Sequence, residues 1–269
     1  MTDNAELIER GSRTAKRGFK NEKDIAVKFN NWQSDQDAQE WLITMEYDLE
    51  EIERVEAVVL PNKYKADIQV KLSIYLKEAI SAENISIKLV SNPTGFNQVD
   101  KRWIDDYKDM WRIPPDVTQL LKYYTGENHP YKSGTRDSRR MFIDEFSPEE
   151  QELLIGFFET NKIMILTDII KGRGRLTADW MIVALKSDEN TEWVLVPISV
   201  ALNTFGLGDV LMTKQGNIKF GQVGIQRKGG DGGRKTAQML QFKINPALLF
   251  HLEKNTVNLE RISPDELLD

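Results

Sequence analysis

Two neighbouring stretches of the chain alternate strictly between apolar and polar residues, and this pattern constrains the fold more than any other feature of the sequence. In "DIQVKLSIYL", residues 67–76, every second position is Ile, Val or Leu, and "NISIKLVSN", residues 84–92, repeats the alternation. A period of two residues is that of a β-strand with one buried face. We therefore expect two half-buried strands that pair as a hairpin, with Lys88 on the polar face of the second strand.

Helical periodicity dominates the sequence before this hairpin, and strand patterns dominate the last third. Apolar spacings of three and four predict helices over 21–32, 34–45 and 49–58. Further helices are expected over 102–111 and 147–161, where Ser147, Pro148 and Glu150 form a capping-box pattern. Strands are expected over 162–170, 179–186, 191–198, 216–226 and 239–246. Because no linker interrupts these segments, the sequence predicts one mixed α/β domain with a central sheet flanked by helices.

Composition excludes several classes of protein. The 269 residues include no cysteine and only two histidines, so disulfides and zinc sites built from these residues are excluded. The N-terminus lacks the apolar core of a signal peptide, and the densest apolar run, residues 163–170, is too short to span a bilayer. We therefore expect a cytoplasmic protein with no membrane association.

The stretch "QRKGGDGGRKTAQMLQFK", residues 226–243, combines four glycines with five basic residues against the single acid Asp231, in a chain whose net charge is −6. A phosphate-binding P-loop is excluded because Arg234 separates Gly233 from Lys235 and a strand pattern follows. Apolar strands flank the stretch closely, which argues against a linker. It is either a solvated basic loop or a strand–loop–strand element whose basic tip grips DNA.

Asp67 and Lys88 carry the chemistry that the hairpin suggests. Pairing of the two strands would bring the carboxylate at the start of one beside the amine on the other. A carboxylate that holds a divalent cation beside a lysine suits phosphodiester hydrolysis, since the cation acidifies a bound water and the lysine positions that water or the phosphate. The alternative is that Lys88 is simply the exposed half of an amphipathic strand.

The order of a helix, a strand that begins with Asp and a strand that carries x-x-Lys resembles the PD-(D/E)xK nuclease superfamily. Within it, the chain resembles the HinP-type restriction endonucleases, which cut GCGC. The segments that carry this resemblance span most of the chain and keep their order: "GFKNEKDIA", "IKLVSN", "GFNQVDK", "RRMF", "LTDIIKGRG", "IQRKGGD" and "MLQFKINP". The resemblance implies a restriction-endonuclease-like fold and Mg²⁺ as the cofactor. It divides one nuclease domain, 1–269, into a helical N-terminal region, 1–57, a catalytic hairpin, 64–92, and a DNA-recognition region, 163–250.

The resemblance assigns the active site residue by residue. Asp67 matches the metal-binding aspartate and Lys88 the catalytic lysine, and the backbone carbonyl of Ile87 would be a further metal ligand. Glu22 matches an acid that many such nucleases direct at the metal, although an exposed helix glutamate is an equal alternative. Ser86 stands where the superfamily usually has Asp or Glu. A serine hydroxyl is a weak, neutral ligand, so the site would bind metal through water or depend on Glu22.

Candidate DNA contacts come from the resemblance and from the basic segments. Gln98 matches a position where a side chain can enter the duplex, against the alternative of an ordinary loop glutamine. Arginine suits guanine, and phosphate contacts position the protein without reading sequence. The expected base-reading residues are Arg227, Lys228, Arg234, Gln241 and Lys243, and the expected phosphate contacts are Lys171, Arg173 and Arg175.

The sequence thus predicts a Mg²⁺-dependent type II restriction endonuclease that cleaves double-stranded DNA at a short G·C palindrome, GCGC by resemblance. A methyltransferase that protects host DNA would be its functional partner. Two alternatives stay open: a repair or junction nuclease of the same superfamily, and a DNA-binding protein that has lost catalysis, which Ser86 suggests. The pattern leaves the oligomeric state open between a monomer and a homodimer.

Overall fold

A computed structural model describes residues 20–60, 68–174, 177–186, 190–230 and 234–252. The chain forms two compact units, each assembled from separate segments. The first comprises residues 1–21, 98–177 and 205–244, and the second comprises residues 22–97, 178–204 and 245–269. Because the segments of the two units alternate along the chain, no linker marks the division in the sequence.

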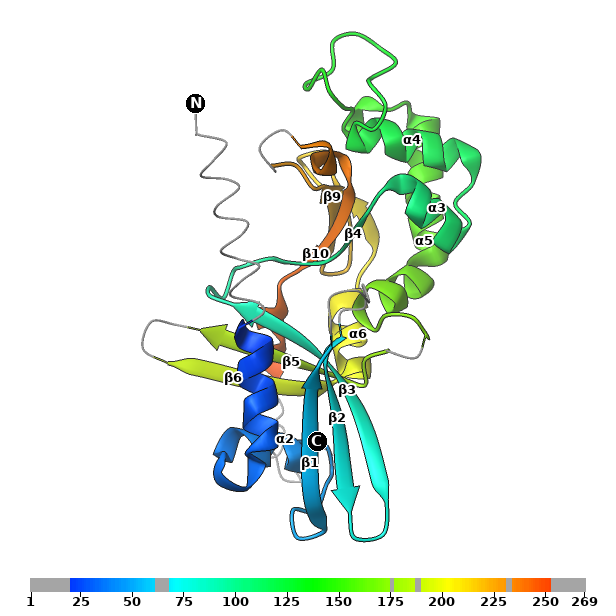
Figure 1. The fold of residues 1–269 in the computed structure, drawn as a ribbon. Coiled ribbons are helices and arrows are strands. Elements are labelled where there is room, and N and C mark those ends of the chain that lie inside the picture. Colours follow the sequence, from blue (N-terminus) through cyan, green and yellow to red (C-terminus); the bar gives the residue numbers. More distant parts are fainter. Residues whose placement is uncertain (1–19, 61–67, 175–176, 187–189, 231–233, 253–269) are drawn as a thin grey trace, which may run out of the picture. The chain divides into compact units, whose positions relative to one another are not determined.

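The second unit is built on a five-stranded sheet in the order β1-β2-β3-β5-β6 (Figure 1). The strands are β1 (Ile52–Val59), β2 (Ile68–Leu76), β3 (Ile80–Val90), β5 (Trp180–Lys186) and β6 (Thr191–Pro197). The central strand β3 pairs antiparallel with β2 and parallel with β5, and the two outer pairs are antiparallel. The expected mixed sheet and the expected hairpin are therefore confirmed.

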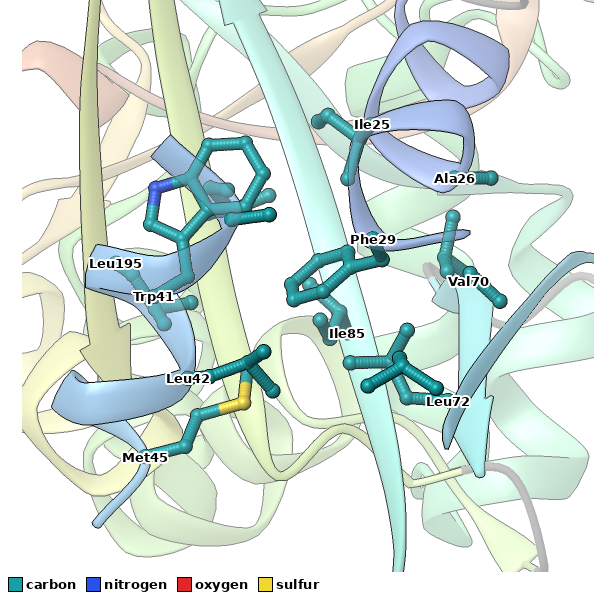
Figure 2. Close-up of a cluster of buried hydrophobic side chains, with 14 of the residues drawn as sticks. Ile25, Ala26, Phe29, Trp41, Leu42, Met45, Val70, Leu72, Ile85 and Leu195 are labelled. Atoms are coloured by element: carbon teal, nitrogen blue, oxygen red, sulfur yellow. The ribbon is translucent and has the colours of Figure 1, made fainter. Parts of the chain in front are cut away.

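Two helices cover one face of this sheet. They are the helix over residues 20–30 and α2 (Gln36–Thr44), joined by the 3₁₀ turn η1 (Trp32–Ser34). Figure 2 shows Ile25 and Phe29 from the first helix, with Trp41 from α2, packed against Ile85 of β3 and Leu72 of β2. Asp35 caps α2 by accepting a hydrogen bond of 3.0 Å from the backbone of Ala38. The helix α6 (Ile198–Gly206) follows β6, and the 3₁₀ turn η6 (Pro246–Leu249) follows residue 245.

The first unit contains a second five-stranded sheet, in the order β4-β10-β9-β8-β7. The strands are β4 (Asn97–Arg102), β7 (Val210–Met212), β8 (Ile218–Phe220), β9 (Val223–Arg227) and β10 (Leu240–Ile244). Its helices are α3 (Ile104–Trp111), α4 (Pro115–Thr125) and α5 (Pro148–Ile170), with the 3₁₀ turns η2 (Ile143–Glu145) and η5 (Lys235–Gln238). Tyr107 and Trp111 stack at 4.5 Å and both meet the ring of Phe242 edge-on, so these aromatic residues form part of the core of this unit.

Two segments form the other type of element from the one predicted, and the strand expected over residues 216–226 divides into the antiparallel pair β8 and β9. A helix is expected over residues 49–58, but β1 occupies Ile52–Val59, so the N-terminal region over residues 1–57 is not wholly helical. The register of β1 shifts between Ile52 and Arg54. This bulge puts Ile52 and Val55 three residues apart on the buried face, a spacing that imitates a helix.

The run 162–170 is expected to be a strand, but it is the second half of α5. Ile165, Leu166, Ile169 and Ile170 are buried, whereas Ile163 is 81% exposed, which is the pattern of a helix face. The capping box at Ser147 starts α5, and its C-cap is Lys171, directly before Gly172. Packing of this face overrides the strand preference of the β-branched residues.

Candidate active site and nucleic-acid interface

The centre of β3 is buried on both faces. Ile85 and Ile87 belong to the core beneath the two helices, and Ser86 and Lys88 alternate to the opposite face. Ser86 is fully buried and Lys88 is only 6% exposed. The alternative that Lys88 is simply the exposed half of an amphipathic strand is therefore excluded. β3 is the middle strand of the sheet, and a middle strand can be covered on both sides.

Burial of Lys88 is costly, because an ammonium group loses its hydration when it leaves water. Lysine is seldom buried this deeply unless opposite charges or hydrogen bonds compensate. Among the described residues, the other buried charged side chain is that of Glu22, which lies at 5% exposure on the helix over residues 20–30. The alternative interpretation of Glu22 as an exposed helix glutamate is thus excluded.

Glu22 and Lys88 interact electrostatically. Burial raises the pKa of Glu22 to about 7, and the positive charge of Lys88 opposes this rise. A carboxylate with such a pKa gains stability from a further positive charge beside it. The structure therefore brings together two of the predicted catalytic residues, which come from a helix and a strand far apart in sequence.

Ser86 adds an unusual feature to this region. Its hydroxyl is one of the few buried polar groups for which the described residues supply no hydrogen-bond partner. An unsatisfied buried hydroxyl costs roughly 1–3 kcal/mol, so such a group commonly marks a position where water or an ion completes the site. Glu22 and Ser86 therefore provide oxygen atoms of the kind that Mg²⁺ prefers.

The position of Ile87 suits a backbone ligand. Within the described residues, the ladder between β2 and β3 ends at the pair Ile68–Ser86, so Ile87 has a strand partner in β5 alone. Asp67, the predicted metal-binding aspartate, directly precedes Ile68 in the chain but lies outside the described residues. No cluster of three histidine or acidic side chains that could hold a metal is found in the described portion of the chain.

The predicted DNA contacts that the structure describes are in the first unit, and several flank the loop between β9 and β10. Arg227 pairs with Leu240 across the two strands, and Lys243 pairs with Gly224. Gly229 and Gly230 adopt positive φ angles of 62° and 59°, a conformation that favours glycine. These glycines let the chain leave β9 without strain, so the prediction of a strand–loop–strand element is confirmed.

The structure presents these side chains to solvent unequally. Gln98, Arg173 and Arg234 are exposed, and Lys171, Lys228 and Lys243 are half-buried. Although exposed, Arg173 is hydrogen-bonded within the unit, since it donates to the carboxylate of Asp168 and to the carbonyl of Met110. Arg175 lies outside the described residues.

Gln241 is 3% exposed, and its amide donates to the carbonyls of Arg227 and Lys228 at 3.5 and 3.3 Å. In this structure it fastens the two strands at the base of the loop. Burial also lowers the pKa of Lys243. The predicted base-reading set therefore includes one residue whose amide is already used within the protein.

One group of residues near this loop was absent from the sequence prediction. The segment between α4 and η2, residues 126–142, places Asp137 3.9 Å from the guanidinium of Arg227. Asp137 also binds Arg139. The basic run "TRDSRR", residues 135–140, was a signal that could have drawn attention to this segment.

Comparisons with known proteins agree with this architecture. Over residues 45–250 the chain matches the family described as R.HinP1I restriction endonuclease. A crystal structure of the restriction endonuclease MspI in complex with its cognate DNA shares the fold, with a TM-score of 0.62 and 14% identity. That match covers 87% of this chain and 92% of MspI. No curated protein sequence gives a significant match. The family match covers more than half of the chain, so the chain belongs to the R.HinP1I restriction endonuclease family.

Proposed function

We propose that the protein is a Mg²⁺-dependent type II endonuclease that cleaves double-stranded DNA at GCGC. Membership of the restriction endonuclease family supports the class of enzyme. The observation that carries the proposal is the burial of Lys88 in the central strand, together with the buried carboxylate of Glu22, whose pKa its positive charge lowers. Such a pair has no evident use in a protein that only binds DNA, because burial of two charges is costly.

The residues of the site have different roles in hydrolysis. Asp67, Glu22 and the carbonyl of Ile87 would hold Mg²⁺, and the hydroxyl of Ser86 would be a further, neutral oxygen for the site. When bound, Mg²⁺ acidifies a water molecule and neutralises charge on the phosphate. Lys88 orients the attacking water or the scissile phosphate, and its charge stabilises the additional negative charge of the transition state. The products are a 5′-phosphate and a 3′-hydroxyl, and by family resemblance the cut follows the first G.

Glu22 compensates for the serine on β3. Where the superfamily usually has an acid, this chain has a neutral hydroxyl, and the carboxylate comes from the helix over residues 20–30. Metal binding must displace a proton from Glu22 below pH 7, because its pKa is about 7.

The first unit supplies the DNA contacts in this proposal. Gln98 and the side chains around the β9–β10 loop contact base edges, and Lys171, Arg173 and Arg175 contact phosphates.

No helix in the described residues is long and apolar enough to cross a membrane. The enzyme would act on DNA inside the cell, together with a methyltransferase that protects host sites.

The test is cleavage of unmethylated plasmid DNA with and without Mg²⁺, followed by sequencing of the fragment ends. We expect discrete cuts at GCGC only when Mg²⁺ is present. Discrete cuts at another sequence would keep the enzyme class and reject the GCGC assignment. Nicks that depend on DNA structure would support a repair nuclease, and tight binding without cleavage in any divalent metal would support a DNA-binding protein with a lost active site.

A further inference from the structure

One carboxylate in the segment 126–142 joins two arginines that lie far apart in sequence. Asp137 accepts hydrogen bonds from Nε and Nη2 of Arg139, both at 2.9 Å, and from the backbone N–H of Arg139 at 3.0 Å. Its second oxygen lies 3.9 Å from Nη1 of Arg227. Chiefly through the hydrogen bond from the Arg139 side chain, the pKa of Asp137 falls to about 2, so it is ionised at neutral pH.

The two arginines differ sharply in exposure. The side chain of Arg227 is 11% exposed and its Nε donates to the carbonyl of Ala237 at 3.1 Å. The side chain of Arg139 is 69% exposed. Of the two guanidinium groups bound to Asp137, the one that reaches solvent is therefore Arg139.

The pairing with Asp137 also leaves Arg139 able to bind a ligand. It uses Nε and Nη2, and the opposite edge of the planar guanidinium, formed by Nη1 and Nη2, keeps two parallel N–H groups. Two parallel N–H donors match the O6 and N7 acceptors of guanine in the major groove. Because Asp137 already orients this side chain, less conformational entropy is lost when DNA binds.

The segment is fastened to the sheet that carries the predicted base-reading residues. Gln238 donates to the carbonyl of Gly126 at 2.7 Å, and the hydroxyl of Tyr124 donates to the carbonyl of Ile225 at 2.9 Å. Nearby, Arg140 packs on the ring of Phe142 at 3.9 Å. Arg139 is thus the outward member of a basic cluster beside the β9–β10 loop.

We propose that Arg139, oriented by Asp137, is a further specificity-determining residue that donates two hydrogen bonds to a guanine of the recognition site. Arg227 then acts as a positioning residue that holds Asp137 from the protein side. The proposal rests on the proposed function, because it takes duplex DNA with G·C pairs as the ligand. It changes the sequence-based assignment, in which Arg227 itself reads a base.

The test compares the sequences that variants select from a pool of randomised duplexes. Every protein carries Lys88→Ala so that bound DNA stays intact, and Mg²⁺ is present throughout. In this background, Arg139→Lys keeps the charge but loses the planar pair of donors. We expect its preference for guanine at one position of the site to fall about 10-fold, with the other positions unchanged. Asp137→Asn should weaken the same preference.

The matched control is Arg54→Lys, an exposed arginine in β1 that is also paired with a carboxylate, Glu56, at 2.8 Å. It should leave the selected sequence unchanged. Thermal unfolding of each variant checks that the fold is intact. If Arg139→Lys selects the same sequence as its parent while Arg139→Ala binds all duplexes more weakly, Arg139 contacts phosphate and the proposal is wrong.

The outcomes also separate this proposal from the proposed function. A parent that selects no sequence would overturn the proposal. A guanine preference that depends on Arg139, in a protein whose Lys88-bearing form never cuts DNA, would support the proposal and reject the nuclease. Cleavage at GCGC with no effect of Arg139→Lys would support the proposed function and reject the role of Arg139 in specificity.

Discussion

At the scale of one residue, protonation of Glu22 should make the free energy of unfolding of the metal-free protein depend on pH. Burial raises its folded-state pKa to about 7 from an ordinary value of 4.5. The folded state therefore binds more protons than the unfolded state between these two pH values, so its stability is greatest below pH 4.5 and falls as the pH rises. Above pH 7 the ionised carboxylate is buried without its metal.

We predict that, in EDTA, the contribution of Glu22 to the free energy of unfolding falls by about 2–3 kcal/mol between pH 4.5 and pH 8. Glu22→Gln should remove this component of the pH dependence, because glutamine does not titrate. Urea unfolding at pH 5 and pH 8 measures it. Glu53→Gln, at an exposed position of β1, is the control. Equal pH dependence in the wild type and in Glu22→Gln would contradict the prediction.

Ser86 offers a second prediction for a single residue. Its fully buried hydroxyl has no partner among the described residues, so removal should relieve a desolvation cost. Ser86→Ala should raise the free energy of unfolding in EDTA by about 1 kcal/mol. In the same strand, the hydroxyls of Ser81 and Tyr47 are hydrogen-bonded at 2.6 Å, so Ser81→Ala should lower that free energy by a similar amount. Destabilisation by Ser86→Ala would show that the hydroxyl is satisfied.

The end of α4 illustrates what an element contributes beyond its own sequence. Gly126 ends the helix with a φ of 81°, and a Cβ there would lie 2.5 Å from the backbone oxygen of Arg139. The helix terminus and the segment that carries Asp137 are thus in direct contact. Any side chain at this position must push that segment away.

We predict that Gly126→Ala lowers the free energy of unfolding by about 2 kcal/mol or more, from the unfavourable φ and the steric clash together. Gly134→Ala is a matched control, since Gly134 has a φ of 80° but nothing within 4 Å of the added Cβ. It should cost about 1 kcal/mol, the conformational component alone. Urea unfolding of both variants measures the difference. Equal losses would mean that the contact with Arg139 is not tight.

At the scale of the whole molecule, the predicted functions fall in different units. Glu22, Ser86 and Lys88 belong to one unit, and the described residues predicted to contact DNA belong to the other. Each unit has its own sheet and its own core. Substitutions at the two sets of residues should therefore have separable effects on cleavage and on binding.

We predict that Lys88→Ala lowers the single-turnover rate of DNA cleavage at least about 100-fold, because it removes the group that orients the reactants. Its dissociation constant for DNA should change by less than about 3-fold, a difference below 1 kcal/mol. Arg234→Ala, in the other unit, should weaken DNA binding more than it slows cleavage of saturated complexes. Rapid-quench kinetics and fluorescence anisotropy give the two quantities. Loss of DNA binding in Lys88→Ala would contradict the separation.

Local pattern in the sequence was sufficient for the hairpin of β2 and β3, for the start of α5 at Ser147 and for the helix α3. Each depends on contacts between residues that are close in the chain, so periodicity and capping chemistry reveal it. The sequence also indicated the family, because the segments that resemble it keep their order over most of the chain. Glu22 and Lys88 were named for this reason, although their pattern allowed an exposed alternative.

Tertiary structure alone decided the features that depend on residues far apart in sequence. The bulge in β1 and the buried face of α5 reversed two local predictions, because packing against distant elements outweighs intrinsic preference. The burial of Lys88 follows from the central place of β3 in its sheet, which no local pattern records. The shared carboxylate of Asp137 likewise joins Arg139 and Arg227 only after α4 and β9 have packed together. Sequence determined which chemical groups are present, and the fold decided which of them meet and which remain exposed.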